Sequence, residues 1–207
     1  MQEEQKPGTF RAIPPEELDE EYKRIVANIL PGKPCVKVAL KLEQTPRSIE
    51  NYRFFASQFG TPGSIIYPCC FVDASPSQGF PNSRVLYIDN KLDVKDELTK
   101  LYSEKSLEFV CADAKTFQPQ NDHDLLLILN PTLHTRSLSH LVKPGKLILA
   151  NNYHRNANQM FEEPDSFEFL GLIDDRQRGN PVIVGIDEAR AIYRKFTDFL
   201  SVFKKLQ

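Results

Sequence analysis

Acidic and amide side chains stand at the ends of the short apolar runs in the middle of this 207-residue chain. Five such runs follow one another: Ser64–Cys70, Arg84–Asp89, Leu107–Asp113, Asp124–Asn130 and Lys146–Asn152. Continuous apolar runs are typical of strands buried on both faces of a parallel sheet. In such sheets ligands bind beyond the carboxyl ends of the strands. The runs therefore predict where a polar ligand is held, at the end that carries Asp89, Asp113 and Asn130, but they do not identify that ligand.

Composition limits the class of protein. With 41% hydrophobic residues, the chain can bury one good core. The net charge of −2 provides no overall basic field, which argues against a nucleic-acid partner. No run approaches membrane-spanning length, and the polar start, Met1–Lys6, does not resemble a signal peptide. We therefore expect a soluble, cytoplasmic protein without a membrane partner.

The cysteines and histidines do not predict a metal site. The four cysteines lack the paired two-residue spacing that builds a zinc site, and we expect buried free thiols instead. They are Cys35, Cys69, Cys70 and Cys111. The four histidines are scattered and form no helical ligand pair. They are His123, His134, His140 and His154.

The N-terminal part of the chain is predicted to be an extension, residues 1–47, that packs on an α/β domain formed by residues 48–207. Apolar residues recur at helical spacing over Leu18–Leu30, and Val36–Leu42 alternates apolar residues with lysines, as in a half-buried strand. A second helix is predicted to begin at Pro46 and to end at Gly60, which suits a left-handed exit.

Two crossovers are predicted between the first three strands. A helix over Asp93–Tyr102 is long enough to return the chain to a parallel neighbour. The crossover Phe71–Ser83 is shorter. Within it, Ser75-Pro76-Ser77-Gln78 has the pattern of a capping box with proline just inside the helix start. We therefore expect a short helix there, with its exposed amides directed at the crevice.

The C-terminal part is predicted to be a hairpin followed by a helix. Phe167–Ile173 and Pro181–Ile186 are strand-like and are separated by a polar turn. Apolar residues from Ile192 to Leu206 then lie on one helical face. That face either docks on the protein's own sheet or forms a surface for a homodimer or another partner.

Five parallel-type strands followed by a hairpin resemble the element order of class I S-adenosylmethionine-dependent methyltransferases, over roughly residues 48–186. The segment Leu141–Leu149, with Pro144-Gly145 at its turn, is similar to that family's entry into the fifth strand. The resemblance implies a Rossmann-like three-layer α/β sandwich with a mostly parallel sheet of about seven strands and a C-terminal antiparallel hairpin. It also implies S-adenosylmethionine as the cofactor.

The resemblance implies roles for two strand-end segments. Asp89 occupies the place of the acidic residue that holds the ribose hydroxyls, and a carboxylate can accept two such hydrogen bonds. Asp113, followed by Ala114, matches the position that contacts the adenine amino group. Aspartate is also a common turn residue at strand ends, so each match taken alone has a second explanation.

The loop after the first strand departs from the family. Tyr67-Pro68-Cys69-Cys70 resembles the Asp-Pro-x-Cys opening of amino-group methyltransferases, but the family's glycines are replaced by Phe71 and Asp73. Glycine matters there because a ligand can approach the backbone closely only where no side chain intervenes. Cys69 lies in this loop. Either Asp73 meets the methionine ammonium and the helix start at Ser75 its carboxylate, or no cofactor binds. A turn or cap role explains Asp73 equally well.

Candidates for the chemistry lie after the fourth and fifth strands. Asn130-Pro131 resembles the start of the Asn-Pro-Pro-aromatic stretch of amino-group methyltransferases, but Thr132 and Leu133 do not match it. The stacking that the missing ring supplies, worth roughly 1–3 kcal/mol per base, is therefore absent unless another residue supplies it, which argues against nucleic-acid methylation. His154 is the candidate base, because histidine titrates near neutrality.

Two functions stay open from the sequence. One is an S-adenosylmethionine-dependent methyltransferase that acts on a small-molecule or unknown acceptor through Asn130 and His154. The other is a methyltransferase-like fold that has lost catalysis and serves as a binding or interaction module. The lost glycines favour the module, whereas Asp89, Asp113 and the polar segment Asn151–Asn156 favour retained ligand binding.

Overall fold

The computed structural model describes residues 46–101, 108–129, 131–177, 180–193 and 199–207. The helix predicted over Leu18–Leu30 and the strand predicted over Val36–Leu42 lie outside these residues, so the division at 47/48 stays a prediction. Within the described part of the chain, no helix is both long enough and apolar enough to cross a membrane.

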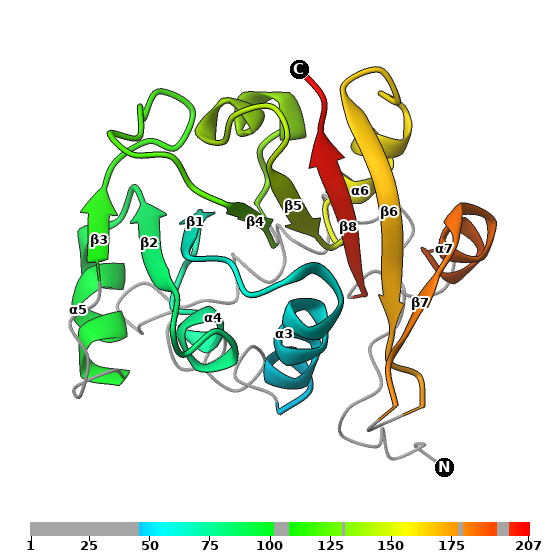
Figure 1. Cartoon of the computed structure of the whole chain (residues 1–207). Coiled ribbons are helices and arrows are strands. Elements are labelled where there is room, and N and C mark those ends of the chain that lie inside the picture. The colour runs from blue at the N-terminus through cyan, green and yellow to red at the C-terminus, as the bar shows by residue number, and fades with distance from the viewer. Residues whose placement is uncertain (1–45, 102–107, 130, 178–179, 194–198) are drawn as a thin grey trace, which may run out of the picture. The chain divides into compact units, whose positions relative to one another are not determined.

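The centre of the molecule is one mixed sheet of eight strands in the order β3-β2-β1-β4-β5-β8-β6-β7 (Figure 1). The first five strands are parallel and follow the five apolar runs of the sequence. They are β1 (Ser64–Pro68), β2 (Arg84–Asp89), β3 (Glu108–Cys111), β4 (Leu125–Ile128) and β5 (Leu147–Ala150). All four residues of β4 are buried, as expected for a strand covered on both faces. The predicted α/β class with a mostly parallel sheet is confirmed.

The C-terminal half of the sheet is antiparallel. Strands β6 (Phe167–Asp174) and β7 (Val182–Val184) form the predicted hairpin, with Leu172 opposite Val184. Strand β8 lies between β5 and β6 and is antiparallel to both. Because β8 is antiparallel to both neighbours, β6 runs in the same direction as β5.

The predicted C-terminal helix over Ile192–Leu206 is wrong. The helix α7 spans Ile186–Tyr193, and the last apolar run is the strand β8 (Leu200–Lys205). Leu200 and Val202 enter the core on one face of the sheet, while Phe203 enters the core on the other. A strand buried on both faces is apolar at consecutive positions, so its pattern also fits a helical stripe in so short a run. The sheet consequently has eight strands rather than about seven.

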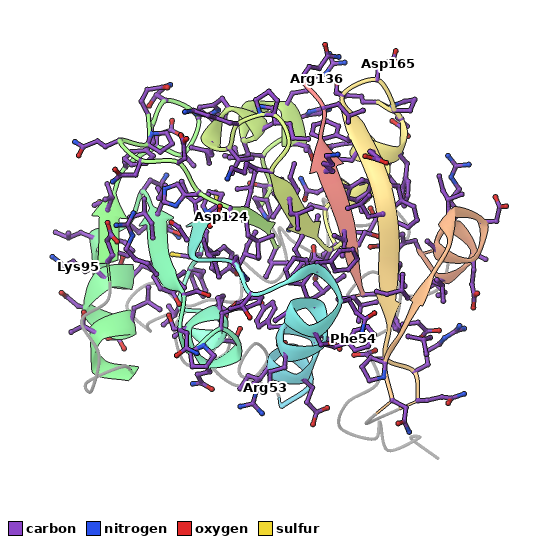
Figure 2. The ribbon with its side chains drawn as sticks, viewed as in Figure 1. Arg53, Phe54, Lys95, Asp124, Arg136 and Asp165 are labelled. Atoms are coloured by element: carbon purple, nitrogen blue, oxygen red, sulfur yellow. The ribbon has the colours of Figure 1, made fainter. Side chains whose placement is uncertain are left out.

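Helices cover both faces of the sheet, which gives the three expected layers. One face carries α3 (Pro46–Phe59), α4 (Ser75–Gly79) and α5 (Leu92–Leu101), and the apolar side chains of α3 and α5 share a core with Ile65 and Tyr87. The other face carries α6 (Asn156–Phe161), α7 and the short 3-10 helices η1 (Thr135–Ser137) and η2 (Ser139–Leu141). Figure 2 shows the apolar side chains between the layers and Arg53, Lys95 and Asp165 at the periphery.

The short helix α4 can approach α3 closely because Gly79 has no side chain. A Cβ atom built on Gly79 would lie 2.5 Å from Cβ and Cδ2 of Tyr52, which is 1% exposed on α3. Tyr52 Cβ cannot retreat without moving the α3 backbone. The approach of these two helices sets the position of the loop between β1 and α4.

We predict that Gly79→Ala destabilises the protein by about 1–3 kcal/mol, because the added methyl group overpacks the contact with Tyr52. In an ordinary helix the same change would stabilise by about 0.5–1 kcal/mol, so the sign is diagnostic. Urea unfolding measures the change. Gly185→Ala is the matched control, since a Cβ there meets nothing within 4 Å. Equal stability of the two variants would contradict this account of the α3–α4 contact.

Candidate functional site

The loop after β1 keeps left-handed backbone at two residues that are not glycine. Cys69 has a φ angle of 52° and Phe71 a φ angle of 47°. A bulky residue in this region is an outlier that costs on the order of 1–3 kcal/mol and persists only where its surroundings impose it. The loop therefore adopts a conformation suited to glycine, although its side chains are those of Cys69 and Phe71.

The carboxylate of Asp89 holds this loop against the end of β2. Its Oδ2 accepts a hydrogen bond from the Phe71 amide at 3.1 Å, and its Oδ1 accepts one from the Lys91 amide at 3.1 Å. Asp89 is 8% exposed. Each carboxylate oxygen has a second lone pair, so Asp89 keeps acceptor capacity for a ligand. The Lys91 ammonium lies 5.9 Å from the centroid of the Phe71 ring, so that ring extends toward the residues that follow β2.

Asp113 lies at the end of the neighbouring strand. Cys111 of β3 is opposite Asp89 of β2, and Asp113 follows two residues later. Asp113 is exposed, and its Oδ1 accepts a hydrogen bond from the Lys115 amide at 2.9 Å, as in an aspartate turn. Ala114 is buried beside it. Asp113 thus both shapes a turn and presents a carboxylate to solvent at the carboxyl edge of the sheet.

The half-buried thiol of Cys69 lies within the field of both carboxylates. The pKa of Cys69 is raised to about 11, chiefly by burial and in addition by the charges of Asp89 and Asp113, while the charge of Lys115 opposes them. The structure therefore brings Cys69, Asp89 and Asp113 together at one edge of the sheet, as the sequence predicted. Their roles as cofactor ligands stay predictions.

Asp73 belongs to the core rather than to the edge of the sheet. It is 4% exposed, accepts a hydrogen bond from the Tyr67 hydroxyl at 3.0 Å, and accepts another from the Ser75 amide at 2.8 Å. Burial raises the pKa of Asp73, and the hydrogen bonds from Ser75 and Tyr67 act in the opposite direction. This geometry favours the cap role over contact with a methionine ammonium.

The predicted capping box at Ser75 is wrong. The N-cap of α4 is Ala74, which makes no side-chain cap bond, and Ser75 is the first helical residue. The preceding aspartate has taken the capping role, because its carboxylate reaches the Ser75 amide. That amide is therefore occupied, and Ser75 itself is 1% exposed. A role for Ser75 in holding a cofactor carboxylate stays a prediction that this geometry does not favour.

The candidates beyond β4 and β5 are described only in part. Asn130 lies outside the described residues. His154 is half-buried in the loop after β5, and its ring lies 5.0 Å from that of Tyr153, edge to face. Burial lowers the pKa of His154 below its ordinary value, so the imidazole is neutral at pH 7. A neutral imidazole can accept a proton.

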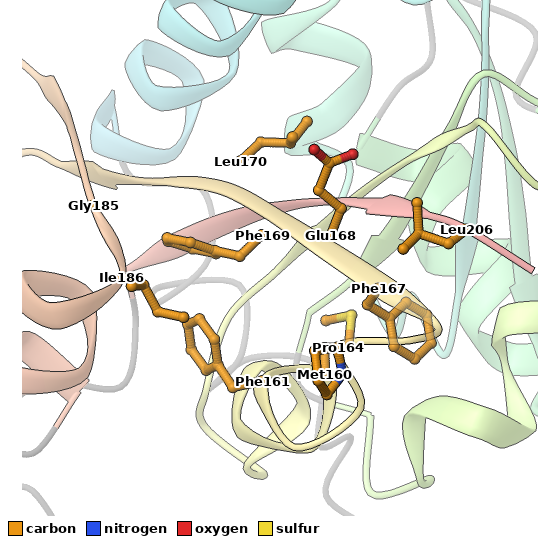
Figure 3. A pocket seen from close by; sticks show the side chains of 10 residues that line it. All are labelled: Met160, Phe161, Pro164, Phe167, Glu168, Phe169, Leu170, Gly185, Ile186 and Leu206. Carbon is orange, nitrogen blue, oxygen red and sulfur yellow. The ribbon is translucent and has the colours of Figure 1, made fainter.

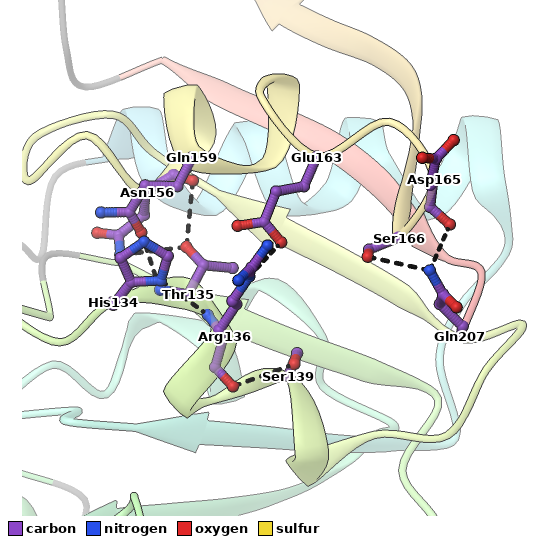
Figure 4. Close-up of polar contacts among 10 residues, drawn as sticks. All are labelled: His134, Thr135, Arg136, Ser139, Asn156, Gln159, Glu163, Asp165, Ser166 and Gln207. Carbon is purple, nitrogen blue, oxygen red and sulfur yellow. Dashed lines mark hydrogen bonds and ion pairs between the residues drawn. The ribbon is translucent and has the colours of Figure 1, made fainter.

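The loops after β4 and β5 are joined by polar contacts that the sequence did not reveal (Figure 4). The side-chain amide of Asn156 donates to the Leu133 carbonyl at 2.9 Å, and the Thr135 amide donates to Gln159 Oε1 at 2.8 Å. Arg136 forms an ion pair with Glu163 at 2.8 Å. The dense polar segment after β5 was the only signal for these contacts. Their partners, more than 20 residues away, were not identifiable from the sequence.

Two cavities lie away from the candidate residues at the carboxyl edge of the sheet. One, of about 630 Å³, runs along β6 and is lined in part by Phe161, Phe169 and Ile186. The other, of about 170 Å³, lies near the amino ends of β4 and β5 and is lined in part by Phe59, Asp124 and Leu147. Neither is lined by Asp89 or Asp113. Among the described residues, no group of three or more His, Cys, Asp or Glu side chains is arranged to hold a metal ion.

Comparison with known proteins gives similarity of fold and not of sequence. No family model matches the chain, and no curated protein matches its sequence. Among solved structures, the N-methyltransferase NodS from Bradyrhizobium japonicum WM9 in complex with S-adenosyl-L-homocysteine is similar with a TM-score of 0.58 at 12% identity, covering 90% of this chain and 98% of that one.

Two further solved structures extend the similarity. The plantazolicin methyltransferase BpumL, also solved with S-adenosylhomocysteine, is similar with a TM-score of 0.56 at 16% identity, covering 93% of this chain and 99% of that one. The glycopeptide N-methyltransferase MtfA has a TM-score of 0.53 at 11% identity, covering 79% and 100% of the two chains. The chain therefore has the fold of the class I S-adenosylmethionine-dependent methyltransferases.

We predict that Cys69 alkylates slowly at pH 8, because burial and the two neighbouring carboxylates keep its thiol protonated. Asp89→Asn should lower the pKa of Cys69 and speed its alkylation, since it removes one of the raising charges. Iodoacetamide labelling followed by peptide mass spectrometry measures the rate at each pH. The exposed Cys111 is the internal control and should label readily in both proteins. An unchanged Cys69 rate in Asp89→Asn would contradict the shared field.

Proposed function

We propose that this protein is an S-adenosylmethionine-dependent methyltransferase with a rebuilt cofactor loop. The observation that carries the proposal is the convergence of Asp89, Asp113 and Cys69 at the carboxyl edge of a sheet whose fold is that of the class I methyltransferases. In open α/β sheets of this kind, that edge is where ligands bind.

The nucleoside end of the cofactor has suitable residues. The Asp89 carboxylate would accept hydrogen bonds from the ribose hydroxyls through its remaining lone pairs. The exposed Asp113 would accept one from the adenine amino group, with the small side chain of Ala114 beside it. These assignments require no burial of an unpaired charge, because backbone amides already donate to both oxygens of Asp89 and to one oxygen of Asp113.

The amino-acid end of the cofactor has less support. The left-handed backbone at Cys69 and Phe71 supports a loop that still follows the course of a glycine-rich turn. The Phe71 side chain, however, stands where the family has none. Asp73 is engaged by Tyr67 and Ser75 within the core. The methionine part of the cofactor would therefore be held chiefly by backbone groups of the loop.

The chemistry asks little of the protein beyond alignment. S-adenosylmethionine, when bound, supplies an electrophilic methyl group. The acceptor would be positioned by the joined loops after β4 and β5, and these loops carry Asn130 and His154. A neutral His154 would take the proton from the attacking group. NodS and MtfA are described as N-methyltransferases, which supports an amine as the first acceptor class to test.

We predict that calorimetric titration with S-adenosylhomocysteine gives measurable binding, which Asp89→Ala abolishes. This variant loses the carboxylate that would meet the ribose and that also holds the Phe71 amide. Asp124→Ala serves as the control, since Asp124 lies at the amino edge of the sheet and pairs with Lys146. No heat and no thermal shift at millimolar ligand would contradict the proposal.

We predict that Phe71→Gly binds S-adenosylhomocysteine about tenfold more tightly, equivalent to about 1.4 kcal/mol, because a ligand can then approach the backbone. Phe71→Ala removes the ring but keeps Cβ and the strained φ angle, so it separates the two effects. We also expect Phe71→Gly to be the more stable of the two variants by about 1 kcal/mol. Calorimetry and urea unfolding give both numbers. Unchanged affinity in Phe71→Gly would show that the Phe71 side chain does not obstruct the site.

A binding module without catalysis is the second candidate function. The observation that favours it is the Phe71 side chain at the glycine position, together with an Asp89 whose two oxygens already accept the amides of Phe71 and Lys91. One assay distinguishes the two functions. A methyltransferase transfers label from S-adenosylmethionine to an amine library, and His154→Ala lowers the rate without lowering cofactor affinity. A module binds the nucleoside without transfer, or does not bind it.

A further inference from the structure

Among the residues that the structure describes, the strand β6 is unpaired on one edge over half of its length. On that edge β7 pairs only with Leu172–Asp174, through Val182–Val184. The chain then passes through Gly185 and enters the helix α7 at Ile186, which turns it away from the sheet. In the described residues, no strand pairs with 167–170 on this edge, although β8 pairs with 167–169 on the other.

The larger cavity occupies the place where β7 would have continued. The cavity of about 630 Å³ is lined by Gly185 and Ile186 at the point where β7 ends, and by the four β6 residues that β7 leaves uncovered on this edge, which are Phe167, Glu168, Phe169 and Leu170. This volume lies within the range of ligand sites, roughly 300–1,000 Å³. A Cβ built on Gly185 would meet nothing within 4 Å, so the space beside it is open.

One wall of the groove is a packed aromatic cluster. The Phe161 ring of α6 lies 5.0 Å from that of Phe169 and 5.2 Å from that of Phe203, and the last two lie 5.4 Å apart. Figure 3 shows Met160 and Phe161 on one side of the β6 ribbon, with Glu168 and Leu170 on the other. An extended segment beside β6 would place its alternate side chains toward these two walls in the same way.

Exposed apolar side chains gather at the same place. Ile186 is 39% exposed and Leu206 43%, and both line the groove. Val182 is 51% exposed as well, but it lies opposite Asp174, at the end of the hairpin away from the groove. In the described part of the chain the one other large exposed apolar residue is Leu92. Two of these four exposed apolar residues therefore line the groove, and apolar exposure in a hollow is a feature of interaction surfaces.

The second wall carries a carboxylate that is open to a basic partner. Glu168 contacts Lys204 at 3.6 Å, and both side chains are about half exposed, at 49% and 44%. An ion pair this exposed contributes little, about 0–1 kcal/mol. Glu168 is therefore free to exchange Lys204 for a cation on an incoming strand, where directly opposed charges of unlike sign are favourable.

We propose that this groove binds an extended peptide segment with alternating apolar and basic residues, which adds a strand to the open edge of β6. The apolar residues of the segment would contact Phe161, Phe169 and Ile186, while its basic residues would lie toward Glu168. Main-chain hydrogen bonds would supply affinity and the two walls would supply specificity. This surface uses no residue of the cofactor site, so it is independent of the proposed methyl transfer.

The probe is a labelled peptide of sequence Lys-Val-Lys-Val-Lys-Val, capped at both ends, titrated against the full chain by fluorescence anisotropy. Binding should weaken at least about tenfold for Lys-Val-Lys-Pro-Lys-Val, because proline removes a ladder donor. It should also weaken for Glu-Val-Glu-Val-Glu-Val, which meets Glu168 with like charge. Hydrogen exchange should slow over residues 167–171 with the first peptide and not over residues 92–101.

Gly185→Leu should fill the groove and weaken peptide binding at least about tenfold, since its side chain enters open space. Gly185→Ser is the matched control, because it adds a small side chain and preserves a cap for α7. Both variants should unfold within a few degrees of the parent.

Three results would overturn the proposal. One is no binding of the first peptide, and another is equal binding of the proline peptide. The third is a concentration-dependent dimer that Gly185→Leu dissolves while no peptide binds, which would assign the groove to a second copy of the chain.

Discussion

The hydrogen bonds of the Asp89 carboxylate are the constraint on which the site depends. One oxygen accepts a hydrogen bond from the Phe71 amide, in the loop after the neighbouring strand β1. The other accepts one from the Lys91 amide, at the start of the crossover that follows β2. A buried carboxylate that accepts backbone amides is held in one orientation, and it fixes the backbone that donates to it. The left-handed conformations of Cys69 and Phe71 cost conformational free energy, and an isolated loop would relax out of them. They persist here because this arrangement imposes them.

The insertion of β8 between β5 and β6 organises the second half of the molecule. Leu149 pairs with Val202 on one side of β8, and Leu172 pairs with Ser201 on the other. The helix α7 follows the third residue of β7, so the hairpin covers only the far half of β6. The same chain geometry therefore completes the core and leaves the apolar groove beside Phe169 and Ile186. The two candidate sites, at the carboxyl edge of the parallel strands and along β6, use different residues.

Much of the fold was predictable from local pattern. The five parallel strands and the helices α3 and α5 were expected close to their observed bounds, because apolar runs and start and stop residues mark them in the sequence. Gly60, for example, takes the left-handed exit of α3, with a φ angle of 88°. The meeting of Asp89 and Asp113 was also predictable, since neighbouring parallel strands bring their carboxyl ends to one edge. The role of Asp73 was not predictable, because both a capping role and a ligand contact agree with its position in the sequence.

The sequence by itself determined the α/β class, the succession of five parallel strands along the chain and the edge at which polar groups gather, because these follow from hydrophobic period and strand direction. Only the tertiary structure decided that Leu200–Lys205 is a strand, since its apolar run satisfies either period and the choice depends on the gap between β5 and β6. Only the tertiary structure turned Asp73 inward to Tyr67 and joined Asn156 to Leu133. Such contacts join residues whose approach depends on the packing of whole elements, and no local pattern encodes that packing.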